Sequence, residues 1–426
     1  MKILLVVHQY WPEYFAGTEN YTHNIAQELS RQGHEVGVFT TYDDHVTPYP
    51  VGKVFEYKEG EVQVFKAQTK RSMKVRIIDT LLNDDYISEF KTVIDKFKPD
   101  IVHIQHLLNM TLSFIDVLVE RNIPVVYSIH DLWFKCPTFR GYVNGSKCLC
   151  TSNEASMVCV DMIMNGYTPY RIRNFLIKLL VKFDFKIQRR NRNTIFRKYL
   201  NMTQAVIVPS QFLNLELNQF GIEKSKIRYI QHGIILPEDK LRNQKRSGDK
   251  IRFVFASHLT SEKGFNATID LFLKLSKKNR NIELDIYGSY QKQSKEIIDY
   301  LALIKEHKQI TYKGNYNPQD TYEVLSKYDV VLVPSLWDEI YGLIVDEALA
   351  LNKFVITSNK GSLPERIIHG ENGLIFDPDI KNDYLVKVKE VISNFTEYKN
   401  KSARVDNTYV SIENHVKTLV DLYKSL

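Results

Sequence analysis

The stretch SLWDEIYGLIVDEALA, residues 335–350, places two Asp-Glu pairs inside an otherwise largely apolar run. The apolar residues Val330 to Val333, which end at Pro334 just before this stretch, predict a buried strand, and the pattern from Gly342 to about Leu351 predicts a helix. The amino terminus of that helix would lie at the carboxyl edge of a sheet, with free backbone N–H groups and a positive dipole end. Such a helix end binds phosphate.

The glutamates that end the two pairs, Glu339 and Glu347, are the first candidate binding residues. Ionised carboxylates in an apolar stretch are usually paired or bound, because burying an unpaired charge is costly. Glu339 falls in the predicted loop, where it would accept hydrogen bonds from sugar hydroxyls. Glu347 falls about one and a half turns into the helix and would reach a ribose. The alternative is that both are solvated or are helix-end charges, with Glu339 favouring the amino terminus.

Strand and helix patterns alternate in the same way along most of the chain. A length of 426 residues and a hydrophobic content of 44% favour two large domains. Near-continuous Val, Ile and Leu runs separated by helical segments are typical of a parallel sheet covered on both faces. The sequence therefore predicts an α/β protein with two doubly wound parallel sheets. The predicted strands are 3–7, 36–40, 62–66, 101–104, 125–129, 205–208, 251–256, 282–287, 310–313, 330–333 and 354–357.

One polar stretch, PEDKLRNQKRSGDK at residues 237–250, has no apolar periodicity and is predicted to be a linker. We therefore expect a first domain at 1–236, a second at 251–408, and a separate amphipathic helix at 409–426. Ligands of such sheets bind at the carboxyl ends of the strands. Two domains of this kind imply a cleft between them.

Two motifs that follow predicted strands add candidates for an anion site. HLTSEKGF, residues 258–265, would place the ammonium of Lys263 beside the same anion, unless Lys263 is only a solvated residue at a helix start. QYWPEYFAGTE, residues 9–19, carries Gly17 at a strand-to-helix junction, where glycine allows the backbone to approach a ligand closely. Turns of every kind also use glycine.

A third motif, SIHDLW at residues 128–133, puts His130 and Asp131 at the end of another predicted strand. A His-Asp pair in this position would bind hydroxyls or share a proton. The structural alternative is that the pair only holds the loop.

Together these motifs resemble a known family. The matching segments are residues 17–40, 98–106, 128–133, the Lys263-Gly264 pair, 338–350 (DEIYGLIVDEALA) and 361–376 (GSLPERIIHGENGLIF). In this order, and over essentially the whole chain, they are similar to the retaining glycosyltransferases of group 1, which have the GT-B fold and a Glu-x7-Glu signature. The resemblance implies two Rossmann-like domains facing a cleft, a nucleotide sugar held mainly by the second domain, and a final helix that crosses back onto the first.

The resemblance also assigns roles to residues. Glu339 would contact hydroxyls of the donor sugar, Lys263 would neutralise the leaving diphosphate, and His130 would touch the sugar near its anomeric centre. The implied reaction retains configuration by front-face attack assisted by the leaving phosphate, and it needs no metal because the helix end and Lys263 replace the cation. The implied donor-binding positions are Gly17, His258, Lys263, Asn315, Tyr316, Glu339, Tyr341, Gly342, Leu343 and Glu347.

The residue at position 258 departs from the family pattern. The family usually places Gly-Arg before the leucine of this loop, whereas this chain has Ser257-His258-Leu259. Arginine is always charged and grips phosphate with a fork, while histidine titrates near neutral pH. Weaker phosphate binding is therefore expected. A non-catalytic relative that binds sugar or a partner transferase is the alternative function.

All four cysteines, Cys136, Cys148, Cys150 and Cys159, lie within a predicted insertion at 134–165. Some members of the family have a similar cysteine-bearing insertion. Four thiolates would make a structural zinc site, but a single residue between Cys148 and Cys150 is a shorter spacing than usual. Buried thiols are the alternative.

A basic amphipathic helix is predicted at residues 170–199, with Arg192 among its basic side chains. It would lie on an anionic membrane, as suits a lipid-linked acceptor, or pack on its own domain with a solvated basic face. The net charge of +7 does not distinguish between these two alternatives for the basic helix. No base-stacking motif indicates binding of nucleic acid. No signal peptide or long apolar run is found. The expectation is a cytoplasmic enzyme, free or at the inner membrane face, that uses a UDP-, GDP- or ADP-sugar and a saccharide or lipid-linked acceptor in cell-surface glycan synthesis.

Overall fold

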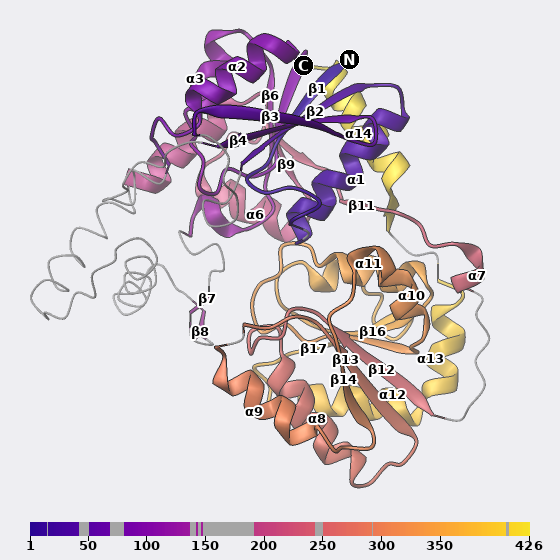
Figure 1. The fold of residues 1–426 in the computed structure, drawn as a ribbon. Coiled ribbons are helices and arrows are strands. Elements are labelled where there is room, and N and C mark those ends of the chain that lie inside the picture. Colours follow the sequence, from indigo (N-terminus) through magenta and orange to yellow (C-terminus); the bar gives the residue numbers. More distant parts are fainter. Residues whose placement is uncertain are drawn as a thin grey trace, which may run out of the picture. The chain divides into compact units, whose positions relative to one another are not determined.

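The computed structural model describes residues 1–14, 16–41, 51–68, 81–136, 142–143, 146–147, 191–242, 250–291, 293–405 and 409–426. The chain divides into two compact units. Unit 1 comprises Met1–His232 and Ile412–Leu426, and unit 2 comprises Gly233–Ser411. Each unit is built around a mainly parallel sheet with helices on both faces (Figure 1). The predicted α/β class with two doubly wound sheets is confirmed.

Unit 1 has an eight-stranded sheet in the order β10-β9-β6-β5-β1-β2-β4-β3, in which only the β3–β4 pair is antiparallel. The chain leaves β1 for β2 on one side and later returns to β5 on the other. The strand order therefore reverses between β1 and β5, at a topological switch point. The strands are β1 (Lys2–Val6), β2 (Glu35–Thr41), β3 (Lys53–Glu59), β4 (Val62–Gln68), β5 (Ile101–Ile104), β6 (Val125–Ser128), β9 (Ala205–Val208) and β10 (Ile227–Tyr229).

Two helices cover one face of this sheet. In α1 (Gly17–Arg31) the side chains of Tyr21, Ile25 and Leu29 recur every four residues and are buried. The last helix, α14 (Ile412–Lys424), joins the same hydrophobic cluster. The opposite face packs against α2 (Ile87–Phe97) and α3 (Phe114–Glu120) through stacked and edge-on phenylalanine rings. Residues about 400 positions apart thus share one core.

The remaining elements of unit 1 are short. A 3₁₀ turn, η2 (Leu132–Phe134), follows β6, and α6 (Gln211–Phe220) begins at Ser210, whose hydroxyl accepts the Leu213 N–H at 3.2 Å. The two-residue strands β7 (Tyr142–Val143) and β8 (Ser146–Lys147) pair with each other.

Unit 2 has a six-stranded, wholly parallel sheet in the order β14-β13-β12-β15-β16-β17. Its strand order reverses between β12 and β15, so this unit also has a switch point. The main strands are β12 (Ile251–Ala256), β13 (Ile282–Tyr287), β14 (Ile310–Gly314), β15 (Val330–Val333), β16 (Phe354–Ser358) and β17 (Gly373–Phe376). A separate two-stranded pair joins β11 (Gly233–Ile234) to β18 (Val410–Ser411).

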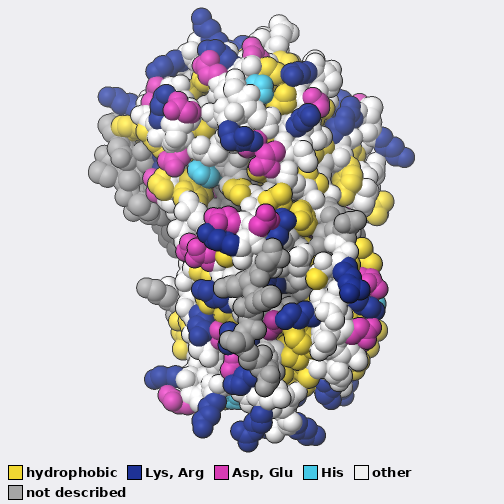
Figure 2. Space-filling model, turned by 90° about the vertical axis from the view of Figure 1, so that its right-hand side faces the viewer, with side chains coloured by type: hydrophobic (Ala, Val, Ile, Leu, Met, Phe, Trp, Pro, Cys, Tyr) yellow, Lys and Arg dark blue, Asp and Glu magenta, His cyan; other side chains and the backbone are white. Residues whose placement is uncertain are grey.

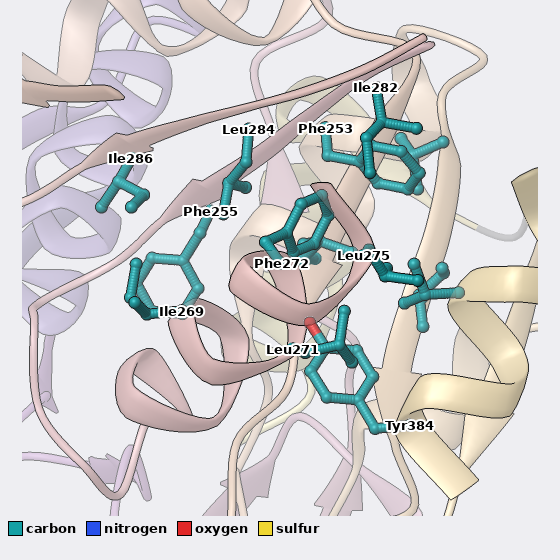
Figure 3. Packing of buried hydrophobic residues seen from close by; sticks show 14 of the residues in the cluster. Phe253, Phe255, Ile269, Leu271, Phe272, Leu275, Ile282, Leu284, Ile286 and Tyr384 are labelled. Atoms are coloured by element: carbon teal, nitrogen blue, oxygen red, sulfur yellow. The ribbon is translucent and has the colours of Figure 1, made fainter. Parts of the chain in front are cut away.

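Helices fill both faces of the unit 2 sheet. Figure 3 shows Phe253 and Phe255 of β12 and Leu284 of β13 in the cluster that contains Phe272 and Leu275 of α8 (Phe265–Ser276). α9 (Lys295–Ile304) and α12 (Asp383–Ser393) contribute to the same cluster. The other face packs against α10 (Thr321–Ser326) and α11 (Leu343–Ala350). The turns η3 (Pro318–Asp320) and η4 (Leu363–Arg366) and the helix α13 (Phe395–Ser402) complete the unit.

The predicted linker at 237–250 is partly helical. α7 (Asp239–Arg242) belongs to unit 2, and residues 243–249 lie outside the described residues. The unit boundaries fall after His232 and after Ser411, a few residues from the predicted domain boundaries.

The prediction of a solvated basic face is wrong for Arg192, which is 0% exposed. Its guanidinium donates to the carbonyl oxygens of Trp133 and Phe134, the latter at 3.2 Å, and lies 5.0 Å from the ring centroid of Phe196. The reason is that the carbonyls ending η2 need donors, which the arginine fork supplies. The earlier basic residues of this segment, up to 190, lie outside the described residues.

Charged side chains of both signs intermingle on the face drawn in Figure 2. Within the described ranges, no helix has the length and apolar character needed to cross a membrane.

Candidate functional site

The carboxyl edge of the unit 2 sheet brings two loops together at its switch point. Gly264, which precedes α8, has φ +79°, and a Cβ there would lie 2.1 Å from the carbonyl oxygen of Pro334 at the end of β15. The Leu336 N–H donates to the Glu262 carbonyl at 2.7 Å. Only glycine allows this approach, and it places the neighbouring Lys263 beside the loop that carries Glu339.

Lys263 and Glu339 form an ion pair, with Nζ 2.5 Å from Oε1. The same oxygen accepts a hydrogen bond from the Ser335 hydroxyl at 2.6 Å and another from the Trp337 indole N–H. Burial alone would raise the pKa of Glu339, but the charge of Lys263 and these hydrogen bonds outweigh it and lower the pKa. Glu339 is therefore an ionised carboxylate with its donors gathered on one oxygen.

The backbone of Glu339 is held from its other side. Gly361 has φ +60°, and a Cβ there would lie 2.2 Å from the Glu339 carbonyl oxygen, which accepts the Ser362 N–H at 2.8 Å. Gly342, with φ +75°, caps the start of α11. The strand, the two glycines and the helix start thus fix the loop without help from a ligand.

Asp346 and Glu347 are neighbours on α11 with different partners. Asp346 Oδ1 lies 2.9 Å from Nε of Arg366, and the two side chains are 0% and 1% exposed. Burial raises the pKa of Asp346 against the pull of Arg366. Burial and the charge of Asp346 raise the pKa of Glu347 to about 7. In the described part of the chain, neither a cation nor a hydrogen-bond donor contacts the Glu347 carboxylate.

A small cavity lies under this edge. It measures about 40 Å³, room for one or two waters, and its lining includes Ser257, Lys263, Ser335, Glu339 and Gly342. The structure thus brings Lys263, Glu339 and the start of α11 into one place, as the sequence predicted. A ligand larger than water would have to lie outside this niche.

The other predicted donor-binding residues of unit 2 lie around the same edge. Burial raises the pKa of Tyr316, and the charge of Glu347 raises it further. The Tyr316 ring therefore lies near Glu347. His258 is exposed, with Nδ1 3.0 Å from the Ser289 hydroxyl, and Asn315 is exposed. Tyr341 is buried, with its ring centroid 4.2 Å from the Arg366 guanidinium, which also donates to its carbonyl. Arg366 is not among the site residues predicted from the sequence.

In unit 1 the adjacent residues His130 and Asp131 each contact other residues and not each other. His130 Nε2 lies 2.9 Å from the amide oxygen of Gln105, while Asp131 Oδ2 lies 3.1 Å from His106 Nε2 and its Oδ1 accepts the Trp133 N–H. The cause is that Asp131 caps η2 and so points away from its neighbour. Burial, with the charge of His106, lowers the pKa of His130 to about 3, so the ring is neutral at pH 7.

Gly17 opens α1, and a Cβ added there would meet nothing within 4 Å. Packing therefore does not require glycine at this position. Of the four cysteines, Cys136 is buried, and the other three lie outside the described residues. Among the residues that the structure describes, no group of three His, Cys, Asp or Glu side chains is placed to hold a metal ion.

Two family models match consecutive parts of the chain. The model described as Glycosyltransferase Family 4 matches residues 15–236, more than half of the chain. The model described as Glycosyl transferases group 1 matches residues 237–407.

Individual proteins are similar at lower identity. An uncharacterized 42.6 kDa protein in the cps region of Klebsiella pneumoniae is 24% identical over 382 residues, which cover 86% of this chain and 87% of that protein. Lipopolysaccharide 1,2-N-acetylglucosaminetransferase of Salmonella typhimurium is 24% identical over 250 residues, which cover 55% of this chain and 63% of the transferase.

Solved structures share the fold across the whole chain. Sucrose-phosphate synthase from Thermosynechococcus elongatus matches with a TM-score of 0.70 and 17% identity, covering 100% of this chain and 98% of that one. Anabaena Alr3699/HepE, solved in complex with UDP, matches with a TM-score of 0.64 and 16% identity over 100% of both chains. These likenesses establish the architecture.

Proposed function

This chain belongs to the group 1 glycosyltransferases, which have the GT-B fold, and from that membership we propose that it moves a sugar from a nucleotide donor to a saccharide or lipid-linked acceptor with retention of configuration. The observation that carries the proposal is the carboxyl edge of unit 2. One lysine, one ionised carboxylate and one helix start meet there, and the same helix carries a second carboxyl group, Glu347, which has no partner among the described residues.

Each of these groups suits one part of a nucleotide sugar. Lys263 and the N–H groups at the start of α11 would bind the diphosphate. Glu339 would accept hydrogen bonds from the sugar hydroxyls, and Glu347 from the ribose. Asn315 and Tyr316 would lie near the base, with His258 at the phosphates. The solved complex of the Anabaena relative with UDP supports a nucleoside diphosphate as the bound group.

The proposed reaction places negative charge on the departing diphosphate. Lys263 and the helix N–H groups are fixed before the reaction, so they stabilise that charge without reorganisation. The acceptor oxygen attacks the anomeric carbon on the face that the phosphate leaves, and the acceptor proton passes to a phosphate oxygen. His130, neutral at pH 7, would contact the donor sugar as a hydrogen-bonding group. The scheme requires neither a protein nucleophile nor a metal ion.

The acceptor is proposed to be part of a cell-surface glycan, which the named Salmonella relative supports because it acts on lipopolysaccharide. Contact with the inner membrane face also stays a proposal. Flotation of the protein with anionic lipid vesicles tests it, and failure to float with them would remove it.

Nucleoside diphosphate release from a panel of UDP-, GDP- and ADP-sugars tests the proposed function. Wild type is compared with Glu339→Gln and Lys263→Ala. The matched controls are Lys250→Ala and Glu283→Gln, which break an ion pair of 2.7 Å at the opposite edge of the same sheet. We expect release from one donor, lost by about a hundredfold or more in the two site variants and kept in the controls.

Silence across the panel would contradict the proposal, provided that crude lipid and glycan acceptors are present and calorimetry finds no donor binding. The non-catalytic relative would then be the better interpretation.

A further inference from the structure

A fully buried ion pair lies behind the start of α11, and the proposed reaction does not use it. Asp346 is in the first turn of α11 and Arg366 is the last residue of the turn η4. Asp346 Oδ1 and Arg366 Nε are 2.9 Å apart. Within the described ranges, however, neither of these atoms makes a well-aligned hydrogen bond, and neither does Asp346 Oδ2. The two charges are close together but poorly directed.

Stability alone gives no reason for this pair. Removing two charges from water is costly, and their attraction offsets that cost only when the geometry is good and further hydrogen bonds are made. Apolar side chains of similar size often stabilise a protein as well or better. The neighbouring Val345, Leu363 and Ile367 belong to an apolar cluster that would suit such replacements. Local rules of this kind are broken mainly where a function requires it.

The guanidinium of Arg366 also contacts the residue just before the helix. Nη2 donates to the carbonyl oxygen of Tyr341, and the Ser362 hydroxyl donates to the same oxygen at 3.2 Å. The backbone of Arg366 is held in turn, because the Asn372 side-chain amide donates to its carbonyl oxygen at 3.2 Å. Asp346 lies at Nε, which leaves the other two nitrogens for carbonyl oxygens. Two donors therefore fix the direction of the Tyr341 carbonyl.

The direction of this carbonyl sets the direction of one N–H group. The Tyr341–Gly342 peptide bond is trans, and a trans peptide is planar with its C=O and N–H on opposite sides. The Gly342 N–H therefore points away from Arg366. No acceptor for this N–H is found among the residues that the structure describes. Gly342 also lines the small cavity beside Lys263 and Glu339.

We propose that Asp346 and Arg366 are positioning residues, which orient the Tyr341–Gly342 peptide so that the Gly342 N–H donates to a phosphate oxygen of the donor. The proposal rests on the proposed function. Asp346 is 0% exposed and Arg366 is 2% exposed, so neither side chain would touch the ligand. Because their charges cancel, the pair aims a backbone dipole without adding a net charge beside the phosphates.

An apolar double variant, Asp346→Leu with Arg366→Met, separates positioning from stability. Leucine has the branched shape of aspartate, methionine follows the stem of arginine, and the net charge of the chain does not change. We expect a Tm within about 5 °C of wild type or above it. A purely structural pair would then leave ligand binding intact.

Binding is measured at about pH 8.5, where Glu347 is ionised with or without the charge of Asp346 beside it. Calorimetry gives the Kd of UDP, or of the GDP or ADP that the donor panel identifies. Ligand-observed NMR gives the Kd of the matching nucleoside, which has no phosphate. We expect the double variant to weaken the nucleoside diphosphate about tenfold or more and to leave the nucleoside unchanged. The kcat for donor release should fall as well, because the same N–H would stabilise the departing diphosphate.

Two single variants complete the comparison. Val388→Ala is the control for lost stability, because Val388 is 0% exposed on α12 in the cluster on the other face of the sheet. It should lower the Tm and keep both Kd values. Arg366→Lys keeps a charge opposite Asp346 but lacks the fork that also reaches the Tyr341 carbonyl. It should weaken the nucleoside diphosphate and spare the nucleoside.

The proposal is overturned if the double variant keeps the wild-type Tm and the wild-type Kd for the nucleoside diphosphate. It is also overturned if the nucleoside and its diphosphate lose affinity by the same factor. If the double variant does not fold, Arg366→Lys decides by the same two criteria. A wild type that binds no nucleoside diphosphate at all would contradict the proposed function and this proposal together, so the two failures are told apart.

Discussion

Glu339 and Glu347 carry the same functional group eight residues apart, and their surroundings shift their pKa values in opposite directions. Lys263 and two neutral donors stabilise the charge on Glu339. Glu347 is partly buried next to Asp346 and has no such donor in the part of the chain that the structure describes, so its charged form is disfavoured. Their spacing in the sequence predicts that both belong to one site but not that they differ.

The pKa of Glu347 makes stability depend on pH. Its value of about 7 in the folded chain exceeds the usual 4.5, so the folded chain holds a proton between these values that the unfolded chain releases. The free energy of unfolding should therefore fall as pH rises through this window, by up to about 3 kcal/mol. Glu347→Gln removes the effect, so its gain in Tm over wild type should be larger at pH 8 than at pH 5. Parallel Tm curves, like those expected for the exposed Glu397→Gln, would contradict this.

His258→Arg should leave donor affinity unchanged or raise it by up to about tenfold, because arginine is always charged and grips phosphate through two donors. The exposed position of His258 leaves room for the longer side chain. Calorimetric Kd values for the nucleoside diphosphate, with kcat/KM for its release, provide the measurement. A large loss would mean that His258 has a role of its own, for which Ser289→Ala is the control because it removes only the hydrogen bond at 3.0 Å.

At the residue scale, the sequence predicts where a side chain lies better than it predicts which residues that side chain contacts. Lys263 and Glu339 meet because a Lys-Gly pair and a loop glutamate both follow strands that lie side by side. Arg366 and Gln105 could not be found in the same way, since their importance comes from tertiary contacts with Asp346 and His130. Whether Asp131 contacts His130 or His106 depends on how η2 begins, and the spacing of residues in the sequence does not reveal this.

At the scale of elements, the donor edge depends on how closely the turn before α8 approaches the end of β15. The strand β15 is wholly buried, and the turn lies against the carbonyl of Pro334, the residue that follows the strand. Gly264 is the contact point, and the loop that carries Glu339 is joined to the same turn by a backbone hydrogen bond. The position of Lys263 is therefore set by backbone packing.

Replacing Gly264 by alanine should separate these elements. The new Cβ would combine left-handed strain, about 1 to 2 kcal/mol, with a contact of 2.1 Å to the Pro334 carbonyl oxygen. Gly370→Ala is the matched control, because its φ of +83° is similar and a Cβ there meets nothing within 4 Å. Urea unfolding should show a loss of stability in Gly264→Ala that exceeds the control by a further 1 to 3 kcal/mol or so. Equal losses of stability in the two variants would mean that the turn before α8 can shift to make room for the new Cβ.

The elements that sequence patterns missed share a physical reason. β3 is a half-exposed edge strand with alternating polar residues, β10 has three residues, and β17 has four residues after a turn. Short strands are formed by their neighbours more than by their own composition. Long buried strands such as β12 and β15 match the predicted ranges because helices cover both faces of the sheet, so nearly every residue of these strands is apolar.

At the scale of the whole molecule, each unit has its own sheet and its own switch point. The carboxyl edge of unit 2 contains a cation and suits a diphosphate. The proposed function therefore assigns the diphosphate of the donor to unit 2.

In the proposed scheme Lys263 and the start of α11 would supply the positive charge that a divalent cation supplies elsewhere, so donor turnover should not change in excess EDTA. Initial rates with and without the chelator, for the donor found in the panel, provide the measurement. Loss of activity that Mg²⁺ or Mn²⁺ restores would contradict the metal-independent scheme.

The cysteine insertion gives a separate prediction. If Cys136, Cys148, Cys150 and Cys159 bind zinc, protein purified without chelators should contain about one zinc per chain by elemental analysis. Serine at Cys148 and Cys150 should abolish it. Absence of zinc from the wild type would end the idea and leave four thiols.

The contribution of α14 to unit 1 also bears on synthesis. Its residues Ile412, Val416 and Leu419 share a cluster with Ile3 and Leu5 of β1. All of unit 2, Gly233 to Ser411, is translated between these two groups. At roughly 5 to 20 residues per second, the ribosome needs about 10 to 35 s to cross that interval. During that time the part of the first sheet that α14 covers would stay exposed to solvent, while α1 already packs on the rest of that face.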